Sequence, residues 1–134
     1  MEIEEALTTY LLAQTGLTAL IDRRFSFDIQ PQFDTLPAVV CINVSDVKDH
    51  HLTGQTTYES PVYQFTVYAT TRAGAMAVGD QLKTALKDYS GTLSGLVVQY
   101  IKILNELRST YTSPEGLILA HIYDLEIEVY FERS

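Results

Sequence analysis

The spacing of hydrophobic residues changes several times along the chain, and each change marks a new predicted element. Near the N-terminus the apolar residues recur at helical spacing: Ile3, Leu7, Tyr10 and Leu11. Glutamates fill the first turn, where the helix dipole favours negative charge, so we predict a helix over residues 2–15 that ends at Gly16. Residues 22–36 contain Pro31 and scattered aromatic residues without a period, which predicts a connecting loop.

Strict alternation of apolar and polar positions predicts two strands, over residues 37–46 and 58–70. The stretch between them, residues 46–60, reads DVKDHHLTGQTTYES. Because it connects two strands that are expected to pair, we predict that it forms a hairpin arm.

The helical period returns over residues 72–89, where an apolar stripe is followed by Gly91. Two further strands are predicted over residues 96–107 and 117–131. In the last strand apolar residues alternate with a row of acids: Asp124, Glu126, Glu128 and Glu132. Carboxylates two residues apart on one strand usually form its solvated face, which we expect here in preference to a paired-carboxylate active site.

These elements predict an α+β fold in one domain over residues 1–134. Its core would be a four-stranded, mainly antiparallel sheet with two helices packed on one face, in the order α-β-β-α-β-β. In the first strand we expect Ala38, Val40, Ile42 and Val44 to lie under the helices.

The face of the sheet opposite the helices is expected to be more apolar than solvent favours. It would carry Val39, Cys41, Val62, Tyr68, Tyr100 and Leu104. A second copy of the chain could cover this face, or residues 22–36 could fold across it.

Composition and charge exclude several classes of protein. The 134 residues suffice for a core without disulfides or metals, and 46% apolar with 19% charged residues is neither a disordered nor a membrane composition. The formal charge of −8 argues against tight nucleic-acid binding. The acidic N-terminal residues are unlike an export signal. Cys41 is the only cysteine and lies in a predicted strand, which indicates a structural role.

Candidate chemistry centres on His50 and His51. Neighbouring residues of a strand point to opposite faces, so two adjacent histidines bind one ion poorly. A divalent-metal site built from these histidines with Asp46 or Asp49 stays open as an alternative, and it would make the protein a small acidic metal-dependent binding module or enzyme. Motifs for phosphate binding or nucleophilic catalysis are missing from the sequence, and His121 is expected to be a core or edge histidine.

Several features resemble one protein family. They are Pro37 before the first long strand, the arm motif from Asp49 to Gly54, and Gln64-Phe65-x-Val67-Tyr68-Ala69 followed by an alanine-rich helix. Together they resemble the tail-terminator or tail-completion (head-to-tail joining) proteins of long-tailed phages, over most of the chain.

The resemblance implies a non-enzymatic virion protein without a cofactor. It implies a homo-oligomeric, hexameric ring that is assembled in the host cytoplasm, caps the tail tube at its head-proximal end and contacts the tail tube protein and the head completion or connector protein. DNA would pass through the ring without specific binding, for which an acidic lining is suited. The interface would then include the arm and the uncovered face: Asp46, Lys48, Asp49, His50, His51, Leu52, Thr53, Gln55, Val62 and Tyr68.

Overall fold

The computed structural model of the protein describes residues 3–22, 24–27, 37–45, 48–51, 54–87, 89–93, 96–112 and 114–132. Within these ranges, residues 27, 45, 48–51, 54–58, 111, 118 and 119 are described by their backbone. The helices are α1 (Ile3–Leu12), α2 (Thr15–Ile21) and α3 (Arg72–Leu86). The strands are β1 (Phe25–Phe27), β2 (Ala38–Ser45), β3 (Lys48–His51), β4 (Gly54–Glu59), β5 (Val62–Ala69), β6 (Gly91–Leu93), β7 (Leu96–Thr112) and β8 (Ile118–Glu132).

The eight described strands form one mixed, curled sheet with β8 at its centre. β5 and then β4 pair with one edge of β8, and β7 pairs with the other edge. β2 lies outside β5, β1 lies outside β2 and runs parallel to it, and β6 pairs with β7. The eight strands occupy six strand positions across the sheet. β5 and β4 lie one after the other along the same edge of β8, and β2 and β3 lie one after the other on their outer side.

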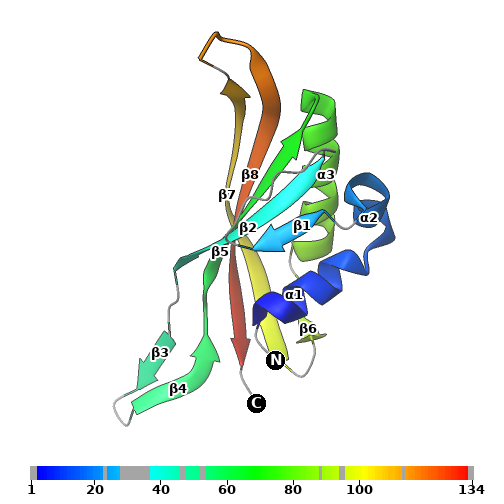
Figure 1. The fold of residues 1–134 in the computed structure, drawn as a ribbon. Helices are drawn as coiled ribbons and strands as arrows, with labels where there is room; N and C mark the ends of the chain where they lie inside the picture. The colour runs from blue at the N-terminus through cyan, green and yellow to red at the C-terminus, as the bar shows by residue number, and fades with distance from the viewer. Residues whose placement is uncertain are drawn as a thin grey trace.

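The three helices lie on the same side of this sheet and bury its apolar face (Figure 1). Cross-strand rows such as Cys41, Phe65 and Leu125 point toward the helices and are fully buried. α3 begins at the N-cap residue Thr71, whose Oγ1 accepts a hydrogen bond from the backbone N–H of Gly74 at 2.9 Å. None of the described helices is both long and apolar enough to cross a membrane.

The predicted four-stranded antiparallel sheet with two helices is wrong. The predicted long elements are present, but α2, β1, β3, β4 and β6 are additional, and β1 makes the sheet mixed. Gly16 lies inside α2, although we expected it to end the first helix. Each of the missed elements has seven residues or fewer, which is too short for a reliable apolar period.

The predicted orientation of the first long strand is also wrong. Val39 and Cys41 belong to the core cluster beneath the helices, whereas Ile42 and Val44 are exposed on the opposite face. Both faces of this strand are apolar in sequence, so alternation alone could not distinguish the buried face from the open one.

The structure describes only part of residues 22–36, the segment that could have covered the open face. In the described part of that segment, Phe25 packs against the core cluster, with its ring 6.0 Å from that of Phe65. Phe25 therefore lies on the helix side. Residues 28–36 lie outside the described residues.

Candidate interaction site

The predicted arm is the outer half of a long bent hairpin. β2 and β5 form its inner half within the body, and β3 and β4 form its outer half, which we call the arm (residues 48–59). The hairpin bends between β4 and β5 at Ser60 and Pro61, where proline supplies no backbone donor. The carbonyl of Pro61 still accepts a hydrogen bond from the backbone N–H of Val129 at 3.0 Å, which fixes the bend against β8.

Most of the arm extends beyond the body of the protein. Only Tyr58 and Glu59 pair with β8, opposite Glu132 and Phe131, whereas His50 and His51 pair only with β4 in the described structure. Figure 1 shows β3 and β4 projecting from the body on the side away from α2 and α3. An isolated two-stranded hairpin is only marginally stable in water, and its outer edges offer unpaired backbone groups. The arm is therefore suited to docking against another chain.

The predicted interface residues fall into three groups. The backbone of β3 and β4 carries Lys48, Asp49, His50, His51 and Gln55. Outside the described residues lie Asp46, Leu52 and Thr53. The last group, Val62 and Tyr68, lies at opposite ends of β5, half-buried on the face of the sheet away from the helices.

The described side chains include no group of three or more His, Cys, Asp or Glu placed to hold a metal ion. The alternative site at His50, His51, Asp46 and Asp49 lies outside this test, because the side chains of these residues are not among those described. Cys41 is buried in the core and forms no disulfide in the described part of the chain.

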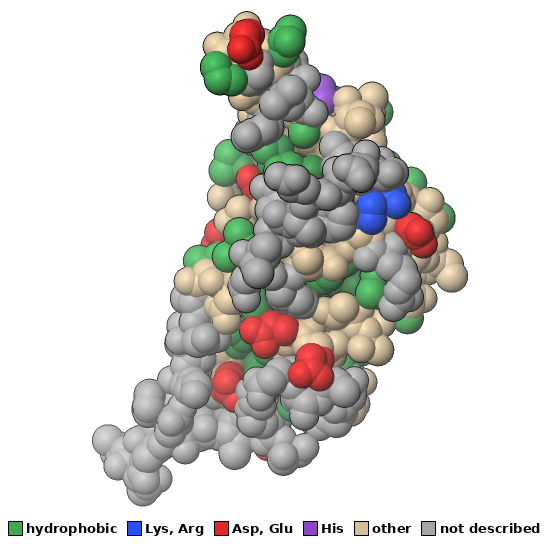
Figure 2. Space-filling model, in the orientation of Figure 1, with side chains coloured by type: hydrophobic (Ala, Val, Ile, Leu, Met, Phe, Trp, Pro, Cys, Tyr) green, Lys and Arg blue, Asp and Glu red, His purple; other side chains and the backbone are tan. Residues whose placement is uncertain are grey.

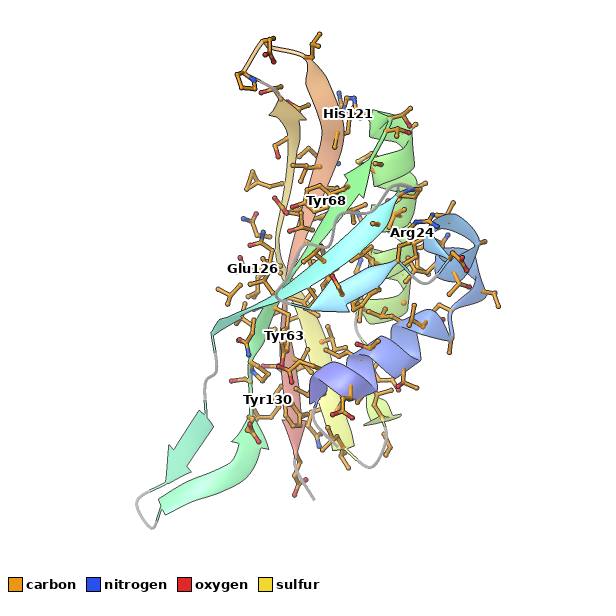
Figure 3. The ribbon with its side chains drawn as sticks, viewed as in Figure 1. Arg24, Tyr63, Tyr68, His121, Glu126 and Tyr130 are labelled. Carbon is orange, nitrogen blue, oxygen red and sulfur yellow. The ribbon has the colours of Figure 1, made fainter. Side chains whose placement is uncertain are left out.

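The open face of the sheet combines acidic and apolar side chains. Asp124, Glu126 and Glu128 follow one another on this side of β8, and Figure 3 shows Glu126 directed away from the helices. Asp124 accepts a hydrogen bond from Gln64 at 3.2 Å, and Glu128 accepts one from the hydroxyl of Tyr100 at 2.9 Å. The exposed large apolar residues on or beside this face are Ile42, Val44, Val97, Tyr100, Leu104 and Leu107. The acidic row thus lies on the side without helices, as its alternation predicted.

A positively charged pocket lies on the helix side, between the start of α3 and the β7–β8 hairpin. It has a volume of about 320 Å³, and its charged or titratable lining residues are Arg72, Arg108 and His121. Figure 3 shows His121 on β8 near the end of the sheet where α3 begins. Among the described residues, no carboxylate lines this pocket or lies within ion-pair distance of either arginine. Sequence patterns did not reveal the pocket, because its residues come from three separate elements.

A network of polar side chains lies beside the pocket. Tyr123 is fully buried and donates a short hydrogen bond to the carboxylate of Glu106, which also accepts from Lys83 at 3.0 Å. Burial, and then the bond to Glu106, raise the pKa of the Tyr123 hydroxyl above its usual range. The bonds from Tyr123 and Lys83 lower the pKa of Glu106. Arg108 lies over the Tyr123 ring and donates from Nε to the sulfur of Met76 at 2.9 Å.

A small body with a projecting arm and an open sheet face is suited to work through contacts with other chains. The sequence of residues 5–114 matches the family described as "Tail completion protein gp17". The chain therefore belongs to the tail completion protein gp17 family, and it is a structural protein of a phage tail.

The fold agrees with that of a protein in a phage-like particle. A chain of the solved structure titled "Virion of native gene transfer agent (GTA) particle" matches with a TM-score of 0.69 and 17% sequence identity, covering 97% of each chain. At this identity the likeness shows a shared fold. No curated protein sequence matched the chain.

Proposed function

We propose that this protein caps the finished tail tube as a hexameric ring and forms the head-to-tail joint. It would be assembled in the host cytoplasm and occupy the head-proximal end of the tail. Its partners would be copies of itself, the tail tube protein and the head completion or connector protein. The protein would act without a cofactor and without catalysis.

The observation that carries this proposal is the arm. Apart from Tyr58 and Glu59, its described backbone pairs with no strand of the body, so the body gains little from it. Ordering such a hairpin costs conformational entropy, which a contact with a neighbouring subunit or connector would offset. The formal charge of −8 supports the second part of the proposal, because an acidic ring does not hold the DNA that passes through it.

The arm can be removed with little change to the body. Lys48 lies opposite Glu59, so residues 49–58 can be replaced by Asn-Gly, a dipeptide that favours a two-residue hairpin turn. We expect the shortened protein to keep its melting temperature within a few degrees, since the described backbone that is removed, apart from Tyr58, pairs only within the arm. Ring formation, measured by sedimentation at high concentration, should be lost, and infected cells should produce tails of abnormal length that do not join heads.

A matched variant separates the arm's shape from its histidines. Changing His50 and His51 together to Asn keeps hydrogen-bonding capacity but weakens any metal site. Under the proposed function this variant forms rings at the same concentration as the wild type. A folded, arm-shortened protein that still ends tails and joins heads would contradict the role of the arm. A monomer that melts at higher temperature with added zinc or manganese, and loses this response in the histidine variant, would favour the metal-dependent alternative.

A further inference from the structure

The pocket formed by Arg72, Arg108 and His121 is unusual for this chain. The protein has a formal charge of −8, yet its described surface gathers two arginines and a histidine around one hollow with no carboxylate among the lining residues. The pocket also lies at the start of α3, where the helix dipole adds partial positive charge. Its lining also includes apolar groups: Ala75, Met76 and Ile122 in addition to the Tyr123 ring. The ligand that fits is a carboxylate next to an apolar group.

The same chain presents this combination at the tip of the β7–β8 hairpin, residues 114–117. The tip has the sequence Pro-Glu-Gly-Leu, and all four residues are exposed. Leu117 is 67% exposed, the highest value among the exposed large hydrophobic residues. Gly116 has a φ of +86° and no atoms nearby that would meet a side chain. Figure 2 shows acidic and hydrophobic side chains together at this tip.

The tip cannot reach the pocket of its own chain. The two strands stay paired as far as Thr112 and Ile118, and they carry Glu115 away from Thr110 at the pocket's edge. At about 3.3 Å per strand residue, the paired strands extend roughly 7 Å past Thr110 before the tip begins. Figure 1 shows the hairpin rising past the start of α3. Any tip that fills the pocket must therefore come from another molecule.

We infer that Glu115 and Leu117 of one copy insert into the pocket of Arg72, Arg108 and His121 of the next copy. The tip and the pocket are different surfaces, so the contact is heterologous, and repeated heterologous contacts close into a ring when the rotation between copies permits. Each contact brings a negative group to a positive pocket in a protein whose copies otherwise repel one another. This inference rests on the proposed ring, for which it identifies a subunit contact.

Charge reversal at both partners tests the contact. Arg72→Glu places an acid in the first turn of α3, which the helix dipole favours, so the fold should be kept. At about 150 mM salt, Arg72→Glu and Glu115→Arg should each raise the concentration for half-assembly by roughly tenfold or more, because like charges then face each other. The double variant Arg72→Glu with Glu115→Arg should return close to the wild-type value. Lys87→Glu, which makes the same charge change at the other end of α3, is the control and should assemble as the wild type does.

A chemical cross-link tests the contact independently of ring formation. Arg72→Lys retains the positive charge and provides an amine that a carbodiimide can couple to a carboxylate in direct contact. In a mixture of ¹⁵N-labelled and unlabelled protein, mass spectrometry should find position 72 of one copy coupled to Glu115 of another. The unmodified wild type, which has arginine at this position, is the control.

The outcomes separate this contact from the proposed function. Rings that form normally in Arg72→Glu would overturn the contact and leave the ring intact. A wild type that forms no ring at any concentration would contradict the proposed function, and the cross-link would then decide the contact by itself: its absence overturns the inference. If Arg72→Glu assembles as the wild type does but no longer retains DNA, the pocket is instead a phosphate site. That result would also overturn the contact between tip and pocket.

Discussion

Gly79 shows how one residue fixes the position of α3 on the sheet. A Cβ atom at this position would lie 2.7 Å from Cε1 of Tyr123, a ring that is fully buried and tied to Glu106. Neither the helix nor the ring can move freely, so we expect Gly79→Ala to destabilise the protein by about 1–3 kcal/mol, despite the better helix propensity of alanine. Urea unfolding monitored by circular dichroism measures this difference.

Gly16 provides a matched control for that substitution. It is also a helical glycine, but an added Cβ would meet the flexible end of the Gln81 side chain at 2.3 Å. That amide can rotate away, so Gly16→Ala should leave stability unchanged or raise it by up to about 1 kcal/mol. Equal losses in both variants would show that helix packing does not depend on the glycine at position 79.

Glu106 is expected to make stability depend on pH. Its hydrogen bonds from Tyr123 and Lys83 lower its pKa below the ordinary value of 4.5. A lowered pKa in the folded state stabilises the fold above the unfolded pKa, and this contribution is lost as the pH falls through the folded pKa. The melting temperature of the wild type should therefore exceed that of Glu106→Gln at neutral pH, and the gap should narrow as the pH falls below about 4.5. The effect should be small, because the carboxylate is partly exposed. A gap that widens in acid would contradict this role.

At the level of elements, the long segments with one polar face were predictable. In β8 the acids alternate with residues such as Tyr123 and Leu125, so only one register of the strand buries the apolar side chains. α3 was predictable for the same reason, because its apolar stripe is continuous and the opposite face carries residues such as Asp80 and Thr84.

Elements without that contrast were not predictable. β2 is apolar on both faces. Val39 lies on the face that the helices bury and Ile42 on the open face, and this choice is made by tertiary packing, which the local sequence does not show. β1 has three residues and forms through its parallel pairing with β2, from Phe25 opposite Val39 to Phe27 opposite Cys41. Such a pairing is not encoded in a local period. The arm was predicted as a hairpin, but its extension beyond the body depends on the bend at Pro61 relative to β8.

For the whole molecule, the sequence identified the family but only part of the candidate site. The motif from Gln64 to Ala69 and the segment from Asp49 to Gly54 carried a resemblance to the tail-completion proteins, which the match over residues 5–114 confirms. The positive pocket stayed hidden, because Arg72 and His121 are far apart in the chain and meet only when β8 aligns with the start of α3. The net charge suggested an acidic surface throughout, because a net charge averages over positive and negative regions.

The net charge of −8 leads to a prediction about assembly as a whole. Copies of an acidic chain repel one another over long distances, and salt screens this repulsion. The Debye length falls from about 30 Å at 10 mM salt to about 8 Å at 150 mM, whereas partly enclosed contacts such as an arginine pocket are screened less. Wild-type assembly should therefore strengthen over this range of salt, measured as the concentration for half-assembly by sedimentation.

Two exposed positions outside the arm, the tip and the pocket control for net charge in this experiment. Glu5→Lys reduces the net charge to −6 and should lower the salt needed for assembly, whereas Lys87→Glu makes it −10 and should raise the salt needed. Both variants should converge on the wild type near 150 mM salt, where repulsion beyond about 8 Å is screened. Assembly that weakens steadily from the lowest salt, with the same profile in all three proteins, would show that local ion pairs outweigh the long-range repulsion. The ring would then depend on its charged contacts more than on its apolar ones.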